Sequence, residues 1–130
     1  MLSRFRNKKI PDIYLFFSHF LDHFTILVFA KAAYDAGQDI GLTYGETIQL
    51  ATLGFILFGV ASPIAARVAD IFSRSLIMVV FHFGVGISSI MLSFSHTSFH
   101  LLFGLSSLGF FAAIFHPVGI AMLLLSLIHI

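Results

Sequence analysis

Four long apolar segments follow one another along the chain, and short polar stretches separate them. Each segment has about the 20 residues that an α-helix needs to cross the hydrocarbon core of a membrane. We therefore expect an all-α membrane protein with about four transmembrane helices, over residues 13–33, 44–66, 76–94 and 101–124. Thr43 and Glu46 have the spacing of a capping box, which predicts that the second helix begins near Tyr44.

Two prolines lie inside these apolar segments. Pro63 should bend the last turns of the second helix, because proline removes one backbone hydrogen bond. Pro117, in the stretch AIFHPVG, should free the carbonyl near Ala113, and inside a bundle that oxygen needs water or a polar neighbour. The break is best explained if this face of the fourth helix lines a cavity, with His116 in its wall and Gly119 admitting a helix or a ligand.

The composition supports a membrane protein and excludes several other classes. Hydrophobic residues make up 58% of the chain and charged residues only 10%, with a mean hydropathy of +1.01, which is too apolar for a soluble domain. Cysteine is absent, so disulfides and thiolate metal sites are excluded. The sequence shows no phosphate loop, nucleophilic triad or basic patch for nucleic acid, so we expect neither an enzyme nor a nucleic-acid partner.

The charged residues are distributed unevenly. Lysine and arginine gather in the opening MLSRFRNKK and in ARVADIFSRS, between the second and third helices, whereas the intervening loop holds mostly acids. The positive-inside rule places both basic segments in the cytoplasm. We therefore expect a multi-pass protein of the inner (cytoplasmic) membrane with a cytoplasmic N-terminus, and four spans would return the chain to the cytoplasm.

Ionisable residues lie near the middle of the first apolar segment, in SHFLDHFT. On a helix, His19, Asp22 and His23 share one face, and a charge at that depth costs about 2.5 to 3.5 kcal/mol. The cluster could be an interhelical hydrogen-bond clamp, but membrane residues of this kind favour a proton-accepting or substrate-contacting site beside water. A metal site of His, Asp and His is geometrically possible, but nothing nearby completes the ligand set, so we expect no metal or cofactor.

Small residues and one isolated histidine have a simpler interpretation. Five glycines inside the apolar segments should let helices pack closely: Gly54, Gly59, Gly84, Gly104 and Gly109. His82 is alone in the third segment and is expected to be a hydrogen-bonded packing residue. These positions predict a compact bundle.

This order of features resembles the N-terminal third of a major facilitator superfamily transporter. More narrowly, it resembles the fosmidomycin-resistance-like efflux branch, in which His-Phe-x-Asp lies in the first helix and His-Pro-x-Gly lies in the fourth. Those positions are here His19, Phe20 and Asp22, followed by His116, Pro117 and Gly119. The resemblance implies the N-terminal part of a twelve-helix fold, with the first and fourth helices as counterparts in an inverted repeat and substrate sites near the midplane.

The loop between the second and third helices resembles the superfamily motif Gly-x-x-x-Asp-Arg-x-Gly-Arg-Arg. Asp70 and Arg74 are kept, while other motif positions are replaced by Ala66, Ile71, Ser73 and Ser75. In the family this loop latches the two halves of the carrier, which implies a partial latch at Asp70 and Arg74. An interfacial helix cap with an orienting arginine explains the pair equally well.

The resemblance implies a secondary transporter that exports a small organic or drug-like molecule in exchange for protons. Asp22 with His19 or His23 would carry the proton, and His116 would line the substrate path. One alternative is a self-contained four-helix haem cytochrome, with iron ligands from His19 or His23, His82 and His116. Another is a small four-helix multidrug exporter that uses Asp22.

The chain has room for only four of the family's twelve helices. Residues 1–124 are then expected to be a partial N-terminal transmembrane domain, whose partners are the lipid bilayer and the missing C-terminal half of the same carrier. The last residues, LSLIHI at 125–130, resemble the translation of a transposon-end sequencing adapter. We therefore expect a truncated reading frame with an adapter-derived tail, which should not transport anything alone.

Overall fold

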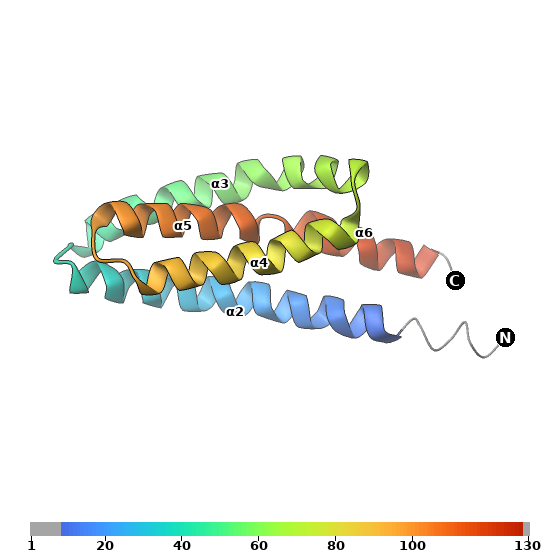
Figure 1. Ribbon diagram of the computed structural model, residues 1–130, viewed down its shortest axis with the longest axis horizontal. Coiled ribbons are helices and arrows are strands. Elements are labelled where there is room, and N and C mark those ends of the chain that lie inside the picture. Colours follow the sequence, from blue (N-terminus) through green and yellow to red (C-terminus); the bar gives the residue numbers. More distant parts are fainter. Residues whose placement is uncertain (1–8, 129–130) are drawn as a thin grey trace.

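The computed structural model describes residues 9–128, with side chains described over 13–125, as a bundle of α-helices (Figure 1). The helices are α2 (Lys9–Asp39), α3 (Tyr44–Ile71), α4 (Arg74–Ser93), α5 (Ser98–Ala112) and α6 (Phe115–Ile128). Because α5 and α6 lie end to end, the described residues form four apolar segments long enough to cross a membrane. The predicted all-α fold with four spans is confirmed. The basic residues before Lys9 and the end of the expected tail, 129–130, lie outside the described residues.

Helix α5 occupies the centre of the bundle and packs along both α3 and α4. Glycines allow this close approach: a Cβ on Gly109 would overlap the carbonyl oxygen of Gly54, and one on Gly54 would lie 2.7 Å from the carbonyl oxygen of Leu105. The packing role expected for these two glycines is confirmed, as it is for Gly84 and Gly104, which have neighbouring side chains where a Cβ would stand. The same expectation is wrong for Gly59, which has nothing within 4 Å.

Helix α2 ends later than its polarity predicts. It continues through the polar stretch that begins at Tyr34 and stops where Gly41 adopts a φ of +79°. There the Leu42 N–H donates to the Gly37 carbonyl (2.8 Å) and the Gly41 N–H to the Gln38 carbonyl (3.0 Å), which is a Schellman end. At 1.5 Å per residue, the 31 residues of α2 span about 46 Å, so its polar end reaches past a hydrocarbon core about 30 Å thick.

The expected capping box is present at the start of α3. The Thr43 N–H donates to the Glu46 carboxylate (2.8 Å), and the Glu46 N–H donates to the Thr43 hydroxyl (3.3 Å). The helix then continues through Pro63 and ends at Ile71, beyond the expected end near residue 66. Its last turn and the start of α4 lie at the same end of the bundle as the start of α2 (Figure 1).

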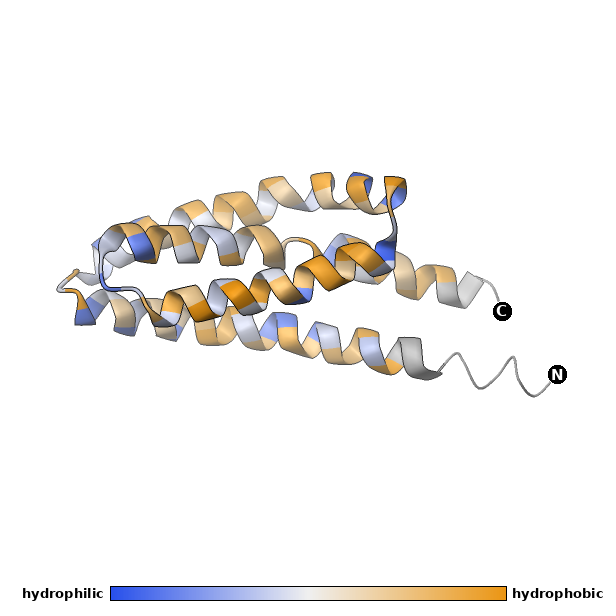
Figure 2. Ribbon diagram, viewed as in Figure 1, coloured by the Kyte–Doolittle hydropathy of each residue, from blue (hydrophilic) through white to orange (hydrophobic). Residues whose placement is uncertain are grey.

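Most residues along the helices are apolar (Figure 2), and many large apolar side chains are exposed on the outside of the bundle. Large residues such as Phe16, Phe55 and Phe83 are more than half exposed, as expected where lipid rather than water surrounds the helices. The interior at one end is built around Met78, Phe81, Phe115 and Val118. This packed end holds the start of α6 in place.

Candidate functional site

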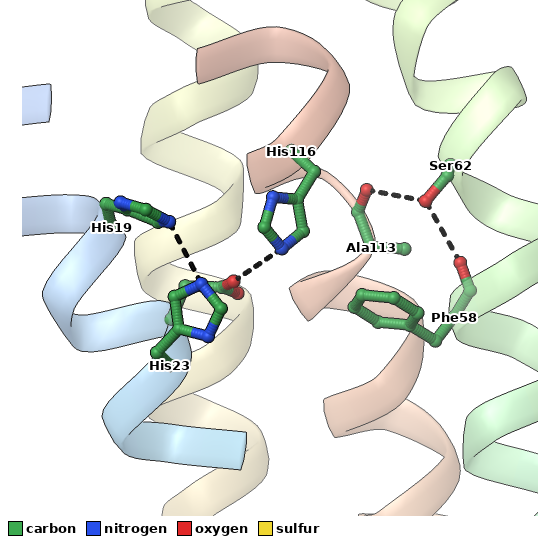
Figure 3. Close-up of polar contacts among 7 residues, drawn as sticks. His19, His23, Phe58, Ser62, Ala113 and His116 are labelled. Atoms are coloured by element: carbon green, nitrogen blue, oxygen red, sulfur yellow. Dashed lines mark hydrogen bonds and ion pairs between the residues drawn. The ribbon is translucent and has the colours of Figure 1, made fainter. Parts of the chain in front are cut away.

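The break between α5 and α6 determines how the candidate site is built. Pro117 has no N–H to donate to the Ala113 carbonyl, and the hydroxyl of Ser62 on α3 donates to that oxygen instead, at 3.1 Å (Figure 3). The same hydroxyl lies 3.1 Å from the Phe58 carbonyl oxygen on its own helix. The polar neighbour that the sequence requires is therefore a protein side chain. The turn at 113–114 starts a new helix at Phe115, and His116 lies in its first turn.

Asp22 on α2 is buried, with 1% of its surface exposed. Its Oδ2 lies 3.3 Å from Nε2 of His116, a separation typical of an ion pair (Figure 3). The geometry is not that of a hydrogen bond, and neither carboxylate oxygen accepts one from any side chain or backbone group in the described part of the chain. The pair joins α2 to α6 near the middle of the membrane-spanning segments.

His19 and His23 complete this group on the open side of α2. Their Nε2 atoms lie 2.9 Å apart, so one ring donates a hydrogen bond to the other. The ring of His19 also stacks on Phe115 with a centroid separation of 5.4 Å, and the ring of His23 lies 5.6 Å from that of His116. We call His19, Asp22, His23 and His116 the His/Asp cluster. Within it, Asp22 points into the bundle while the two α2 histidines stay exposed.

An apolar cavity of about 130 Å³ borders the cluster between α2 and α6. His19, His116 and Gly119 line it together with Phe115 and other apolar side chains. Gly119 is buried, and a Cβ there would lie 3.0 Å from the Phe115 ring, so its close neighbour is an aromatic side chain of its own helix. Pro117 is half-buried in the first turn of α6. Its role in the site is to interrupt the helix between α5 and α6, next to His116.

His82 forms a separate polar network between α4 and α2. Its Nε2 lies 3.1 Å from the buried hydroxyl of Ser18, and its Nδ1 lies 2.7 Å from the Met78 carbonyl oxygen and 3.2 Å from the Tyr14 hydroxyl. The expected role of a hydrogen-bonded packing residue is confirmed. Because both ring nitrogens have partners, His82 offers none to a haem iron, which removes a ligand from the cytochrome alternative.

Asp70 and Arg74 lie at the end of the bundle where α3 meets α4. The Arg74 guanidinium is paired with the Asp70 carboxylate, so the pair links the last turn of α3 to the first turn of α4. The Ser73 hydroxyl accepts a hydrogen bond from the Leu76 N–H (3.4 Å) and caps α4. Neither Asp70 nor Arg74 belongs to the His/Asp cluster.

Two residues of the site were not identified from the sequence. They are Ser62, whose hydroxyl contacts the Ala113 carbonyl, and Phe115, whose ring stacks on His19. A serine in an apolar segment is a usable signal, since its hydroxyl can satisfy a carbonyl that a proline frees in another helix. Nothing in the sequence pairs Ser62 with Ala113 or His19 with Phe115.

Four apolar membrane-spanning segments around a close carboxylate–imidazole pair, with a cavity beside it, are features of a polytopic membrane transport protein. Residues 15–126 match the Major Facilitator Superfamily, so the chain belongs to this family of transporters and carries part of its fold. Searches of curated proteins and of solved structures found no match. Membership of this family confirms the prediction that the protein is a transporter and not an enzyme. It also argues against the alternative of a haem cytochrome.

Proposed function

We propose that the chain is the N-terminal part of a proton-coupled exporter of the fosmidomycin-resistance-like branch. The observation that carries the proposal is the pair formed by Asp22 and His116, 3.3 Å apart on α2 and α6. These residues belong to the two sequence motifs that define the resemblance, one in the first helix and one in the fourth. Such counterparts in an inverted repeat meet where carriers of this kind form their substrate sites.

The pair suggests how proton movement would drive a change of shape. A carboxyl and an imidazole can each gain or lose a proton, and they attract each other as ions only when Asp22 is ionised and His116 is protonated. Gain or loss of a proton therefore changes the attraction between α2 and α6. Because both helices line the cavity, this change would alter access to it.

The cavity beside the cluster favours a small organic or drug-like substrate. Its wall is mainly apolar, and His19 and His116 supply hydrogen-bonding nitrogens at one side. This arrangement suits a molecule with an apolar body and one polar group. In the complete carrier, the C-terminal half would form the opposite wall of the substrate path.

The proposed orientation follows from the basic residues. The start of α2 and the α3–α4 junction lie at one end of the bundle (Figure 1), which we place at the cytoplasmic face of the inner membrane. Asp70 and Arg74 would then form part of a cytoplasmic latch between the two halves.

The decisive experiment uses the complete carrier in inverted membrane vesicles. A pH-sensitive dye reports proton movement when candidate compounds are added to energised vesicles. Asp22→Asn should abolish compound-driven proton movement while the protein remains in the membrane, because the amide cannot exchange the proton. Asp39→Asn, at the exposed end of α2, is the matched control and should behave as the unmodified carrier. Unchanged coupling in Asp22→Asn would overturn the proposal.

A further inference from the structure

We propose that Asp22, His23 and His116 form a binding site for one divalent transition-metal ion of the zinc class. Each residue offers one ligand atom, and these three atoms all lie within 4.8 Å of one another. From the sequence we expect no metal, because no residue near His19, Asp22 and His23 in the chain completes a set of ligands. The fold supplies the missing ligand by placing His116 of α6 against α2.

The spacing of the ligand atoms fits such an ion. Zinc bonds to nitrogen and oxygen are about 2.1 Å long, which places two ligands of a tetrahedral ion about 3.4 Å apart. Oδ2 of Asp22 and Nε2 of His116 are already 3.3 Å apart. The ligand atom of His23 lies within 4.8 Å of the other two, and the exposed side chain has room to turn toward the ion.

The buried carboxylate gives independent support. Asp22 is 1% exposed, and neither of its oxygens accepts a hydrogen bond within the described residues. A buried carboxylate without donors is costly, and the usual compensation is a paired cation or a coordinated metal. A divalent ion between α2 and α6 would coordinate one of these oxygens and compensate the charge of the carboxylate.

The ligand types determine the class of ion. Two imidazoles and one carboxylate suit zinc and its first-row neighbours, whereas magnesium and calcium prefer sets of oxygen ligands. Three protein ligands leave a position for water or another molecule. His19 is not one of these three ligands, although its Nε2 lies 2.9 Å from Nε2 of His23. The inference concerns binding alone and does not depend on the proposed proton-coupled export.

The test measures binding to the chain itself, purified in detergent without a histidine tag. Three of the four histidines outside the cluster are changed to glutamine in every protein, namely His96, His100 and His129. Equilibrium dialysis should then find one zinc ion per chain. Asp22→Asn and His116→Gln should each weaken binding by about 100-fold or more, because each removes a ligand atom. His82→Gln is the matched control and should bind as the parent does.

Two further measurements keep the inference testable. Circular dichroism and gel filtration show whether each variant is folded. If a variant is unfolded, the parent protein is tested instead by the electron paramagnetic resonance spectrum of bound Cu²⁺. Two coordinated imidazoles should give this spectrum a characteristic nitrogen splitting. Absence of bound zinc, binding that ignores Asp22 and His116, or a copper spectrum without nitrogen splitting would each overturn the inference. None of these results depends on transport, so either proposal can fail while the other stands.

Discussion

The hydroxyl of Ser62 lies 3.1 Å from the carbonyl oxygen of Ala113, the oxygen that Pro117 deprives of its helical donor. A serine on α3 thus completes the backbone hydrogen bonding of a break on the neighbouring segment. The break in turn starts α6 and sets the position of His116 against Asp22. Ser62 is therefore a positioning residue for a site to which it contributes no atom.

Replacing Ser62 with alanine should destabilise the bundle. The Ala113 oxygen would lose its donor, and interhelical hydrogen bonds in membranes contribute about 0.6 kcal/mol on average and at most about 1.7. Ser89→Ala is the control, because its hydroxyl donates to Val85 on the same helix (2.8 Å) and faces outward. Reversible unfolding in mixed micelles measures both changes, and equal stabilities for the two variants would contradict the role given to Ser62.

Pro117→Ala should make the Ser62 hydroxyl dispensable. Alanine supplies an N–H for the Ala113 carbonyl, so α5 and α6 can join into one continuous helix. In a double-mutant cycle, Ser62→Ala should then cost measurably less in the Pro117→Ala background than in the parent. Additive effects would show that the two residues act independently.

The glycine contacts between α3 and α5 give a matched pair of substitutions. Gly109→Ala would overlap the Gly54 carbonyl oxygen and separate the helices, at a cost of about 1 to 3 kcal/mol typical of overpacking. Gly59→Ala meets nothing within 4 Å and should be neutral or stabilise α3 by about 0.5 kcal/mol through its helix propensity. Thermal unfolding in detergent should rank the two variants in this order, and a reversed order would contradict the close packing.

Local signals predicted the fold where a short range of sequence determines the structure. Apolar length gave the four spans, and Thr43 with Glu46 gave the start of α3. Helix α2 continues beyond its predicted end at residue 33, because the polar stretch from Tyr34 does not stop a helix. The helix ends instead at Gly41, where a positive φ closes a Schellman turn.

The site was predictable by residue type but not by arrangement. Membrane depth and helical spacing identify His19, Asp22 and His23, and the proline break identifies His116. Their contacts depend on how α6 packs against α2, which no local pattern encodes. For the same reason, the sequence placed Asp22 and the two histidines on one face, whereas packing buries only Asp22.

The network of Tyr14, Ser18 and His82 should hold α2 against α4. His82→Phe keeps the ring volume but removes the hydrogen bond to Ser18 (3.1 Å), and it should cost about 0.6 kcal/mol, with an upper limit near 1.7. Ser18→Ala should cost little more once His82 is Phe, because the interhelical bond is already absent. His100→Phe, on an exposed side chain at the start of α5, is the control. Unfolding in mixed micelles measures all three, and full additivity of the Ser18 and His82 changes would mean that the α2–α4 contact relies on packing alone.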